Sequence, residues 1–282
     1  MGLRWTVRTI DWGEPNVWSR TRIRTALLGL FCAWSVGTPA LAAEFRQDFR
    51  GKPYDASLFR PTGPGFATAI RSDKKGLRIV LPPEHGKKPP VGVVLKTGIK
   101  GDFEITMEFE VVNVKEPEGG QGAGPSLYLT MVSPAQTAVT TGWQLKPGGE
   151  TVFFAHRAST PPGSAREHRV KSAPATGRSG KLRIARTGAV LAYLAAEGDS
   201  DSFREIDQFE VGREDVNGVR VAAANGGSPT LVDVRIGSLN VIADELGDLS
   251  PPPLVRSRWP LWIGTILVLA VGAGYGVWRC RR

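Results

Sequence analysis

The chain has 282 residues, of which 36 are Lys or Arg and 27 are Asp or Glu, so its formal charge at pH 7 is +9. An apolar content of 41% is too high for a disordered chain, and 34 Gly with 21 Pro favour many turns and argue against a helical bundle. A chain this basic suggests nucleic acid or an anionic membrane as partner, unless the charge is confined to the chain ends.

Residues 1–42 have the features of a secretory signal peptide. Three Arg between residues 20 and 24 precede a short apolar run, and residues 40–42 read Ala-Leu-Ala. A positive region, a short apolar core and an A-x-A site are typical of export signals. The apolar core is too short to span a bilayer, which takes about 20 residues. We predict cleavage after Ala42 or Ala43, and the alternative is an uncleaved N-terminal anchor.

Residues 43–242 are predicted to form strands from end to end. Residues 103–111 alternate between apolar and polar side chains, a period of two that is typical of an antiparallel strand with one face in the core. Turn signals such as Asn217-Gly218 separate further apolar runs, which predicts a two-sheet antiparallel sandwich or a barrel. Loops are expected at 113–125 and 158–180. The other expected strands lie at 77–81, 91–95, 127–132, 152–154, 182–185, 190–194, 219–223 and 232–242.

The chain changes character after the predicted domain. Residues 243–258 contain three consecutive Pro, which predicts a short, stiff stalk. Residues 259–278 contain no Asp, Glu, Lys or Arg, carry Trp near both ends and precede an Arg-rich tail at 279–282. This pattern is typical of a transmembrane helix with its C-terminal end in the cytoplasm. The alternative is a cleavable sorting signal.

Most of the excess positive charge belongs to the two ends of the chain. The export signal and the C-terminal tail hold eight Arg, which leaves 28 basic and 25 acidic residues for the remainder. The net charge of the domain with its stalk is therefore only +3, and we predict no nucleic-acid partner. The two cysteines, Cys32 and Cys280, lie outside the predicted domain, which therefore has no disulfide.

Five segments in chain order carry a family resemblance. They are F-R-Q-D-F at 45–49, the alternating strand at 103–111, G-K-L-R-I-A-R-T-G at 180–188, S-F-R-E-I at 202–206 and V-D-V-R-I at 232–236. This layout resembles the concanavalin A-like (LamG, lectin and glucanase) jelly-roll superfamily. Within it, the chain looks like a group of extracytoplasmic domains of unknown function found in planctomycete-type bacteria. The resemblance covers about residues 44–242, and it implies a two-sheet antiparallel sandwich, often carbohydrate-binding and sometimes hydrolytic.

Glu205, Asp207 and Glu210 form an E-x-D-x-x-E pattern. The resemblance to laminarinase- and lichenase-type glycosidases implies a nucleophile, its electrostatic neighbour and an acid/base, in that order. A retaining mechanism needs two carboxyls about 5–5.5 Å apart. A β-bulge is required here, because Glu205 and Glu210 otherwise point to opposite faces of a strand. The motif lies late in the domain, and Gln208 stands where those enzymes have an apolar residue. We therefore interpret these side chains as ordinary surface carboxylates and predict no catalytic residue, with hydrolysis as the alternative.

Few other residues suggest a binding site. Trp143 is the sole Trp of the predicted domain, and with Tyr128 and Phe153 or Phe154 it would form a sugar-stacking patch. Packing of these rings in the core is the preferred interpretation. No cofactor and no metal site are predicted, because the histidines lack metal-ligand spacing and are expected to be surface or packing residues. They are His85, His156 and His168.

The sequence thus predicts an all-β, two-sheet antiparallel sandwich of the jelly-roll type plus one C-terminal transmembrane helix. The protein is expected to be anchored in the cell membrane by a single pass, with the domain on the extracytoplasmic side and the C-terminus in the cytoplasm. The predicted function is non-catalytic binding of a carbohydrate or an envelope protein. The alternatives are a glycoside hydrolase and a structural envelope protein. The small-xxx-small spacing of Gly272 and Gly276 also allows a homodimer through the helix.

Overall fold

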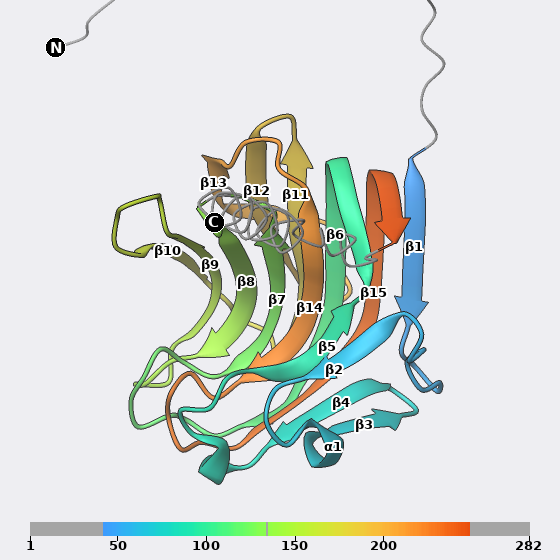
Figure 1. Cartoon of the computed structure of the whole chain (residues 1–282). Coiled ribbons are helices and arrows are strands. Elements are labelled where there is room, and N and C mark those ends of the chain that lie inside the picture. Colours follow the sequence, from blue (N-terminus) through green and yellow to red (C-terminus); the bar gives the residue numbers. More distant parts are fainter. Residues whose placement is uncertain (1–41, 134, 249–282) are drawn as a thin grey trace, which may run out of the picture. The chain divides into compact units, whose positions relative to one another are not determined.

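A computed structural model describes residues 42–133 and 135–248, which are built almost wholly from antiparallel strands (Figure 1). The exceptions are a four-residue helix, α1 (Phe66–Ala69), and a 3-10 turn at Pro83–His85. The strands are β1 (Ala43–Asp48), β2 (Phe59–Thr62), β3 (Ile70–Asp73), β4 (Gly76–Leu81), β5 (Val91–Leu95), β6 (Thr97–Val114), β7 (Gly124–Met131), β8 (Ala138–Leu145), β9 (Thr151–Ser159), β10 (Glu167–Pro174), β11 (Ser179–Thr187), β12 (Val190–Glu197), β13 (Arg204–Glu210), β14 (Val216–Ala224) and β15 (Val232–Asp248).

The strands form two sheets that meet at one place. The front sheet has the order β10-β9-β8-β7-β14-β5-β2. The back sheet runs β13-β12-β11-β6-β15, and β15 pairs on its other side with both β1 and β4, which carries β3. A single pair, Val216 of β14 opposite Ile99 of β6, links the two sheets. The predicted all-β antiparallel sandwich is confirmed.

The apolar face of each sheet is buried against the other sheet. On β6 the alternation that the sequence shows at 103–111 places Ile105 and Met107 in the core, fully buried. Leu127 of β7 and Val221 of β14 are buried in the same core from the front sheet. Burial of apolar surface on one face of every long strand is the driving force that holds the two sheets together.

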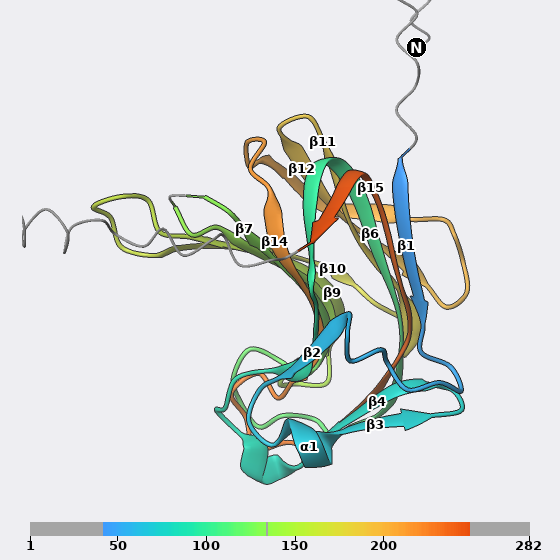
Figure 2. The same ribbon diagram turned by 45° about the vertical axis from the view of Figure 1, so that its right-hand side comes forward.

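The front sheet is strongly bent. Figures 1 and 2 show β7, β8, β9 and β14 curving so that their outer face lies on the hollow side of the bend. The alternation of side chains along a strand means that this outer face receives every second residue, and its composition differs from that of the core. The outer face of the front sheet is therefore a concave surface with its own set of side chains.

The expected strands are found, and one expected loop is not. The segment 158–180 was predicted to be a loop, but β10 occupies its middle and pairs along its whole length with β9. Seven of the eight residues of β10 are exposed, because it is an edge strand whose side chains meet water on both faces. Such a strand is held by backbone hydrogen bonds and carries no apolar alternation, so the pattern that reveals the other strands is missing.

Several predicted segments lie outside the described residues. They are the signal peptide up to residue 41, the Pro-rich part of the stalk, the transmembrane helix at 259–278 with its Gly272 and Gly276, and the tail at 279–282. Within the described ranges, no helix is both long and apolar enough to cross a membrane. β15 continues to Asp248, so it includes the first residues of the predicted stalk.

Candidate functional site

The outer face of the front sheet carries a groove of about 590 Å³. Its lining comes from β7, β8, β9 and β10 and the end of β14, which belong to the bent sheet seen in Figure 2. A second hollow, of about 550 Å³ next to α1, has no Phe, Tyr or Trp in its lining. The rings and polar residues that line the groove are Tyr128, Trp143, Phe154, His156 and His168, with Gln121, Ser126, Thr140, Gln144 and Lys146.

Strand register arranges the outer face in rows that cross the strands. One row reaches from β2 to β10 and consists mainly of larger side chains: Arg60, Val94, Arg220, Tyr128, Thr140, His156 and Val170. The next row begins with small side chains and ends in an aromatic ring: Gly92, Ala222, Ser126, Gly142 and Phe154. Ser126 and Phe154 of the second row line the groove, and this row is called its floor. Tyr128, Thr140, His156 and Val170 of the first row line it as well, and that row is called its wall.

Phe154 lies on this floor. A Cβ built on Gly142 would come within 2.4 Å of Phe154 Cε1, so the ring lies directly over the glycine of the neighbouring strand. Only a residue without a side chain leaves room for a ring in this position. Phe154 is partly exposed and lines the groove, so part of its ring is available to a ligand there.

Tyr128 forms part of the wall beside Arg220. The guanidinium carbon of Arg220 lies 4.2 Å from the centre of the Tyr128 ring, a cation–π contact between adjacent strands. Burial raises the pKa of the Tyr128 phenol, although the positive charge of Arg220 acts in the opposite direction. The phenol is therefore neutral at physiological pH and can donate a hydrogen bond.

His156 and His168 form a stacked pair at the β10 side of the groove. Their rings are parallel within 3° with centres 5.3 Å apart, and Nε2 of His156 lies 3.0 Å from Nδ1 of His168. Burial, followed by the charges of His168 and Arg166, lowers the pKa of His156. Behind the pair, the Tyr193 hydroxyl donates a hydrogen bond of 2.9 Å to the His156 carbonyl oxygen, which ties β9 to the back sheet.

The lowered pKa of His156 gives a testable pH dependence of stability. The unfolded residue titrates near pH 6.5, whereas the folded residue holds its proton less tightly. As the pH falls below about 6.5, the unfolded state binds a proton first and gains stability relative to the folded state. We therefore expect the melting temperature to fall between pH 7.5 and pH 5, and to fall less in His156→Gln. Equal losses in the wild type and the variant would contradict this assignment.

Trp143 borders the groove, but its side chain is buried in the core. Its side chain is 1% exposed, packs beneath the floor and donates a hydrogen bond of 2.9 Å from Nε1 to the carbonyl oxygen of Gly177. Phe153, its neighbour on β9, is fully buried as well. Of the four aromatic residues considered from the sequence, Tyr128 and Phe154 thus face the groove, whereas Trp143 and Phe153 belong to the core.

The E-x-D-x-x-E residues lie on β13, an edge strand of the back sheet. A bulge is present, since Tyr193 pairs with Asp207 and the next residue, Leu194, pairs with Glu205. Glu205 and Glu210 therefore share the outer face, but they lie opposite Leu194 and Val190, four residues apart on β12. At about 3.3 Å per residue this separation is roughly 13 Å, far from the 5–5.5 Å of a retaining pair. Asp207 points to the other face, so the three carboxylates do not converge.

Asp207 holds the open edges of the two sheets together. Its side chain is 13% exposed and forms an ion pair of 2.9 Å with Arg169 of β10, which is the edge strand of the front sheet. Edge strands have unpaired backbone groups, and a side-chain bridge between two edges restrains both. The sequence alone gave no indication of this contact, because 38 residues separate its partners.

We expect Asp207→Asn to lower the free energy of unfolding by about 1 kcal/mol. This value lies at the upper end of the range measured for partly exposed ion pairs. Urea denaturation followed by circular dichroism measures the change. Glu210→Gln is the matched control, since Glu210 is exposed and forms no ion pair among the described residues, and its effect should stay within about 0.5 kcal/mol. If both variants lose equal stability, Asp207 has no special role at this edge.

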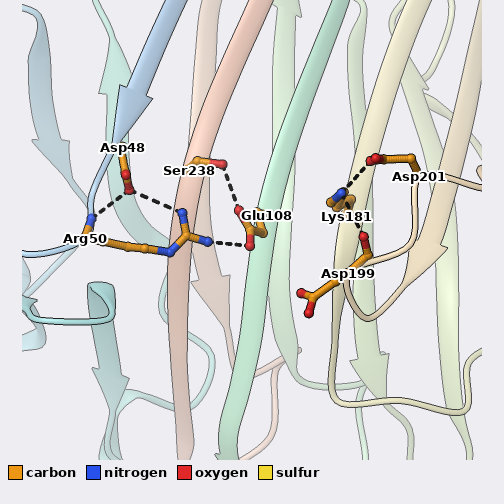
Figure 3. A network of polar contacts seen from close by, with 7 residues as sticks. All are labelled: Asp48, Arg50, Glu108, Lys181, Asp199, Asp201 and Ser238. Atoms are coloured by element: carbon orange, nitrogen blue, oxygen red, sulfur yellow. Dashed lines mark hydrogen bonds and ion pairs between the residues drawn. The ribbon is translucent and has the colours of Figure 1, made fainter.

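The outer face of the back sheet is covered by paired charges and differs sharply from the groove. Figure 3 shows Arg50 in contact with Asp48 and Glu108, while the Ser238 hydroxyl donates to Glu108. In the same view Lys181 pairs with Asp201 and donates to the carbonyl oxygen of Asp199. These charges satisfy one another, so this face offers few free groups to a ligand.

Within the described ranges, no three His, Cys, Asp or Glu side chains come together in a way that could hold a metal ion. His85 lies apart from the other histidines, buried in the 3-10 turn, with Nε2 2.9 Å from the carbonyl oxygen of Pro89. His156 and His168 were predicted to be surface or packing residues, and the structure places both at the groove. No sequence signal reveals this pairing, because it depends on the register of the β9–β10 hairpin.

A family model describes most of the chain. The model of the "protein of unknown function (DUF1583) C domain" matches residues 34–260. The chain belongs to this DUF1583 family. A search of curated proteins found no match to the chain.

Solved structures with the same fold as this DUF1583 domain include sugar-related proteins. A legume lectin-like domain from Entamoeba histolytica has a TM-score of 0.50 at 14% identity, covering 70% of this chain and 96% of its own. A GH43 protein from Bacillus licheniformis has a TM-score of 0.51 at 11% identity, covering 70% of this chain and 39% of its own. A Crh5 transglycosylase in complex with NAG has a TM-score of 0.50 at 10% identity, covering 73% of this chain and 86% of its own. At these identities the likeness concerns the fold, and the DUF1583 domain has the concanavalin A-like jelly roll.

Proposed function

We propose that the DUF1583 domain binds a glycan in the groove on the outer face of the front sheet. The observation that carries the proposal is the partly exposed Phe154 ring, which lies against Gly142 and lines the groove. Binding pockets combine apolar or aromatic surface with a few polar groups that fix orientation, and this groove has both.

The groove matches the chemistry of a sugar ring. A pyranose has a face of C–H groups that packs on an aromatic ring, and hydroxyls around its edge that both donate and accept hydrogen bonds. Phe154 offers the flat apolar surface. Ser126, Thr140 and Gln144 lie around it in the same groove and supply hydroxyl and amide groups. The two kinds of group are close enough to act on one ligand.

The composition of the groove favours binding over glycoside hydrolysis. Glycosidases of the common type need two Asp or Glu residues on either side of the bond that is cleaved. Among the described residues that line the groove, none is Asp or Glu. The carboxylates of the E-x-D-x-x-E motif lie on the back sheet, away from the groove.

The likeness to a lectin-like domain and to a transglycosylase that was solved with NAG supports a glycan as ligand. This support rests on analogy, because a single fold of this kind serves many functions. The aromatic and polar residues of the groove favour the same kind of ligand independently of this likeness.

The proposal is tested by screening the full-length chain on a glycan array and measuring the affinity of the best ligand by calorimetry. Phe154→Ala should weaken binding by about tenfold or more, since it removes the stacking surface. Phe203→Ala is the matched control, because Phe203 is packed under Arg183 on the outer face of the back sheet, and it should bind as the wild type does. An array without any ligand, or equal losses in both variants, would count against the proposal.

We also propose that the domain faces the extracytoplasmic side and is tethered by the helix predicted at 259–278. The support is the sequence pattern at the two ends of the chain. A membrane-impermeant maleimide applied to intact spheroplasts should label Ser164→Cys, an exposed position between β9 and β10. It should label Cys280 only after lysis. Protection of the new cysteine at position 164 would refute this orientation.

A further inference from the structure

The front sheet is almost free of acidic residues. Across all seven of its strands the sole Asp or Glu is Glu167, the first residue of the edge strand β10. Its outer face carries two arginines instead, Arg60 and Arg220, in one row. Lys146, which lines the groove, is paired with Glu150. The positive charges on this face without a carboxylate partner among the described residues are therefore those of Arg60 and Arg220.

Arg220 is the central member of this group. It is partly buried on β14, over the ring of Tyr128, which lines the groove. None of the ion pairs found among the described residues includes Arg220 or Arg60. A guanidinium that is partly withdrawn from water gains stability from an anionic partner, and its planar fork suits carboxylate or sulfate oxygens.

The outer face of the back sheet provides the comparison. Arg78, Arg183 and Arg235 on that sheet each pair with a carboxylate at 3.0 Å or less. Arg50, which lies next to the back sheet, also forms an ion pair with Glu108, as Figure 3 shows. Arg220 and Arg60 differ from these arginines, and from Arg169 of β10, which pairs with Asp207. They lie on the sheet that carries the groove and keep their guanidinium groups free of ion pairs among the described residues.

We propose that the groove selects an acidic glycan, one whose sugars carry uronate carboxylates or sulfate esters. In this arrangement Arg220 binds the anionic group and Phe154 stacks on a sugar ring. Arg220 lies over β7 and the Phe154 ring lies over β8; neighbouring strands are about 4.8 Å apart, so one oligosaccharide reaches both. The inference rests on the proposed glycan-binding function and deepens it by naming the ligand class.

Calorimetry on the full-length chain with three hexasaccharides tests the inference. The probes are a galacturonate hexamer, a sulfated neutral-backbone hexamer and an unmodified β-1,3-glucan hexamer. We expect binding of one or both acidic probes, with affinity falling as salt is raised, and at least tenfold weaker binding of the neutral probe. The two acidic probes distinguish carboxylate from sulfate recognition.

Variants locate the effect at the groove. Arg220→Gln should weaken binding of the acidic probe by about tenfold or more, as expected for loss of a charged hydrogen bond. Arg220→Lys should recover part of the affinity because it keeps the charge. Arg183→Gln removes the same charge from the back sheet and should leave affinity within about twofold. Circular dichroism of each variant verifies folding.

Three results would overturn the inference, and they are distinguishable. Tighter binding of the neutral hexamer would reject the acidic ligand and leave the glycan-binding function standing. Equal weakening by Arg220→Gln and Arg183→Gln would show a general charge effect with no selection by the groove. Failure of all three probes, together with an array that shows no ligand, would reject both the inference and the proposed function.

Discussion

Replacing Trp143 with alanine is expected to lower the free energy of unfolding by about 3–5 kcal/mol. The side chain is among the largest that are fully buried, so the variant leaves a large cavity beneath the groove. It also removes the donor that satisfies the Gly177 carbonyl oxygen. An effect of this size is a large fraction of the total stability of a typical domain. Urea denaturation followed by circular dichroism measures it as a lower midpoint at unchanged slope.

The control for this prediction is Trp143→Phe, which keeps most of the apolar volume and loses only the hydrogen-bond donor. We expect it to cost about 1–2 kcal/mol, the cost of an unsatisfied acceptor plus a small volume change. If Trp143→Ala unfolds at the same urea concentration as the wild type, Trp143 does not pack in the core. It would then have to be reconsidered as a ligand-binding residue.

Replacing Gly142 with valine is expected to weaken ligand binding severely. The new Cβ alone would lie 2.4 Å from Phe154 Cε1 and 2.7 Å from Ser126 Oγ, so the ring has to leave the floor of the groove. The valine side chain then occupies the place of the stacked sugar. We expect affinity for the array ligand to fall by about 100-fold, and overpacking to cost about 1–3 kcal/mol of stability. Calorimetry and urea denaturation measure the two effects separately.

Two further variants make this result specific. Gly247→Val changes a glycine of β15 in the back sheet, where no atom lies within 4 Å of the added Cβ, and it should preserve affinity. Gly142→Val combined with Phe154→Ala removes the clashing ring and should recover part of the lost stability, because the two residues are in direct contact. Wild-type affinity in Gly142→Val would contradict the position assigned to Phe154.

The strands that bury one face were predictable, and the polar edge strand was not. Residues 103–111 alternate because β6 lies in the middle of the back sheet with one face in the core and one in water. β10 has the same backbone geometry but is exposed on both faces, so its sequence carries no period. Hydrophobic periodicity reports burial and identifies a strand only where one face is buried.

The E-x-D-x-x-E motif illustrates a second limit of sequence reasoning. The bulge that the motif would need does exist between the pairs at Tyr193 and Leu194. It lies on an edge strand of the back sheet, however, and Asp207 serves as a partner for Arg169. A local pattern can indicate how side chains alternate along one strand, but it cannot say which sheet that strand joins.

The sequence by itself determined the fold class, because alternation and turn residues act over a few positions and are legible in order along the chain. It also produced the charge division that leaves the domain nearly neutral, and it named Tyr128 and Phe154 among the aromatic residues to consider. Only the tertiary structure decided which of them face a ligand. Strand register brings Arg220, Tyr128 and His156 into one row although they lie far apart in the chain. That register is set by packing of the whole sandwich, since a shift of one residue exchanges the core face and the groove face.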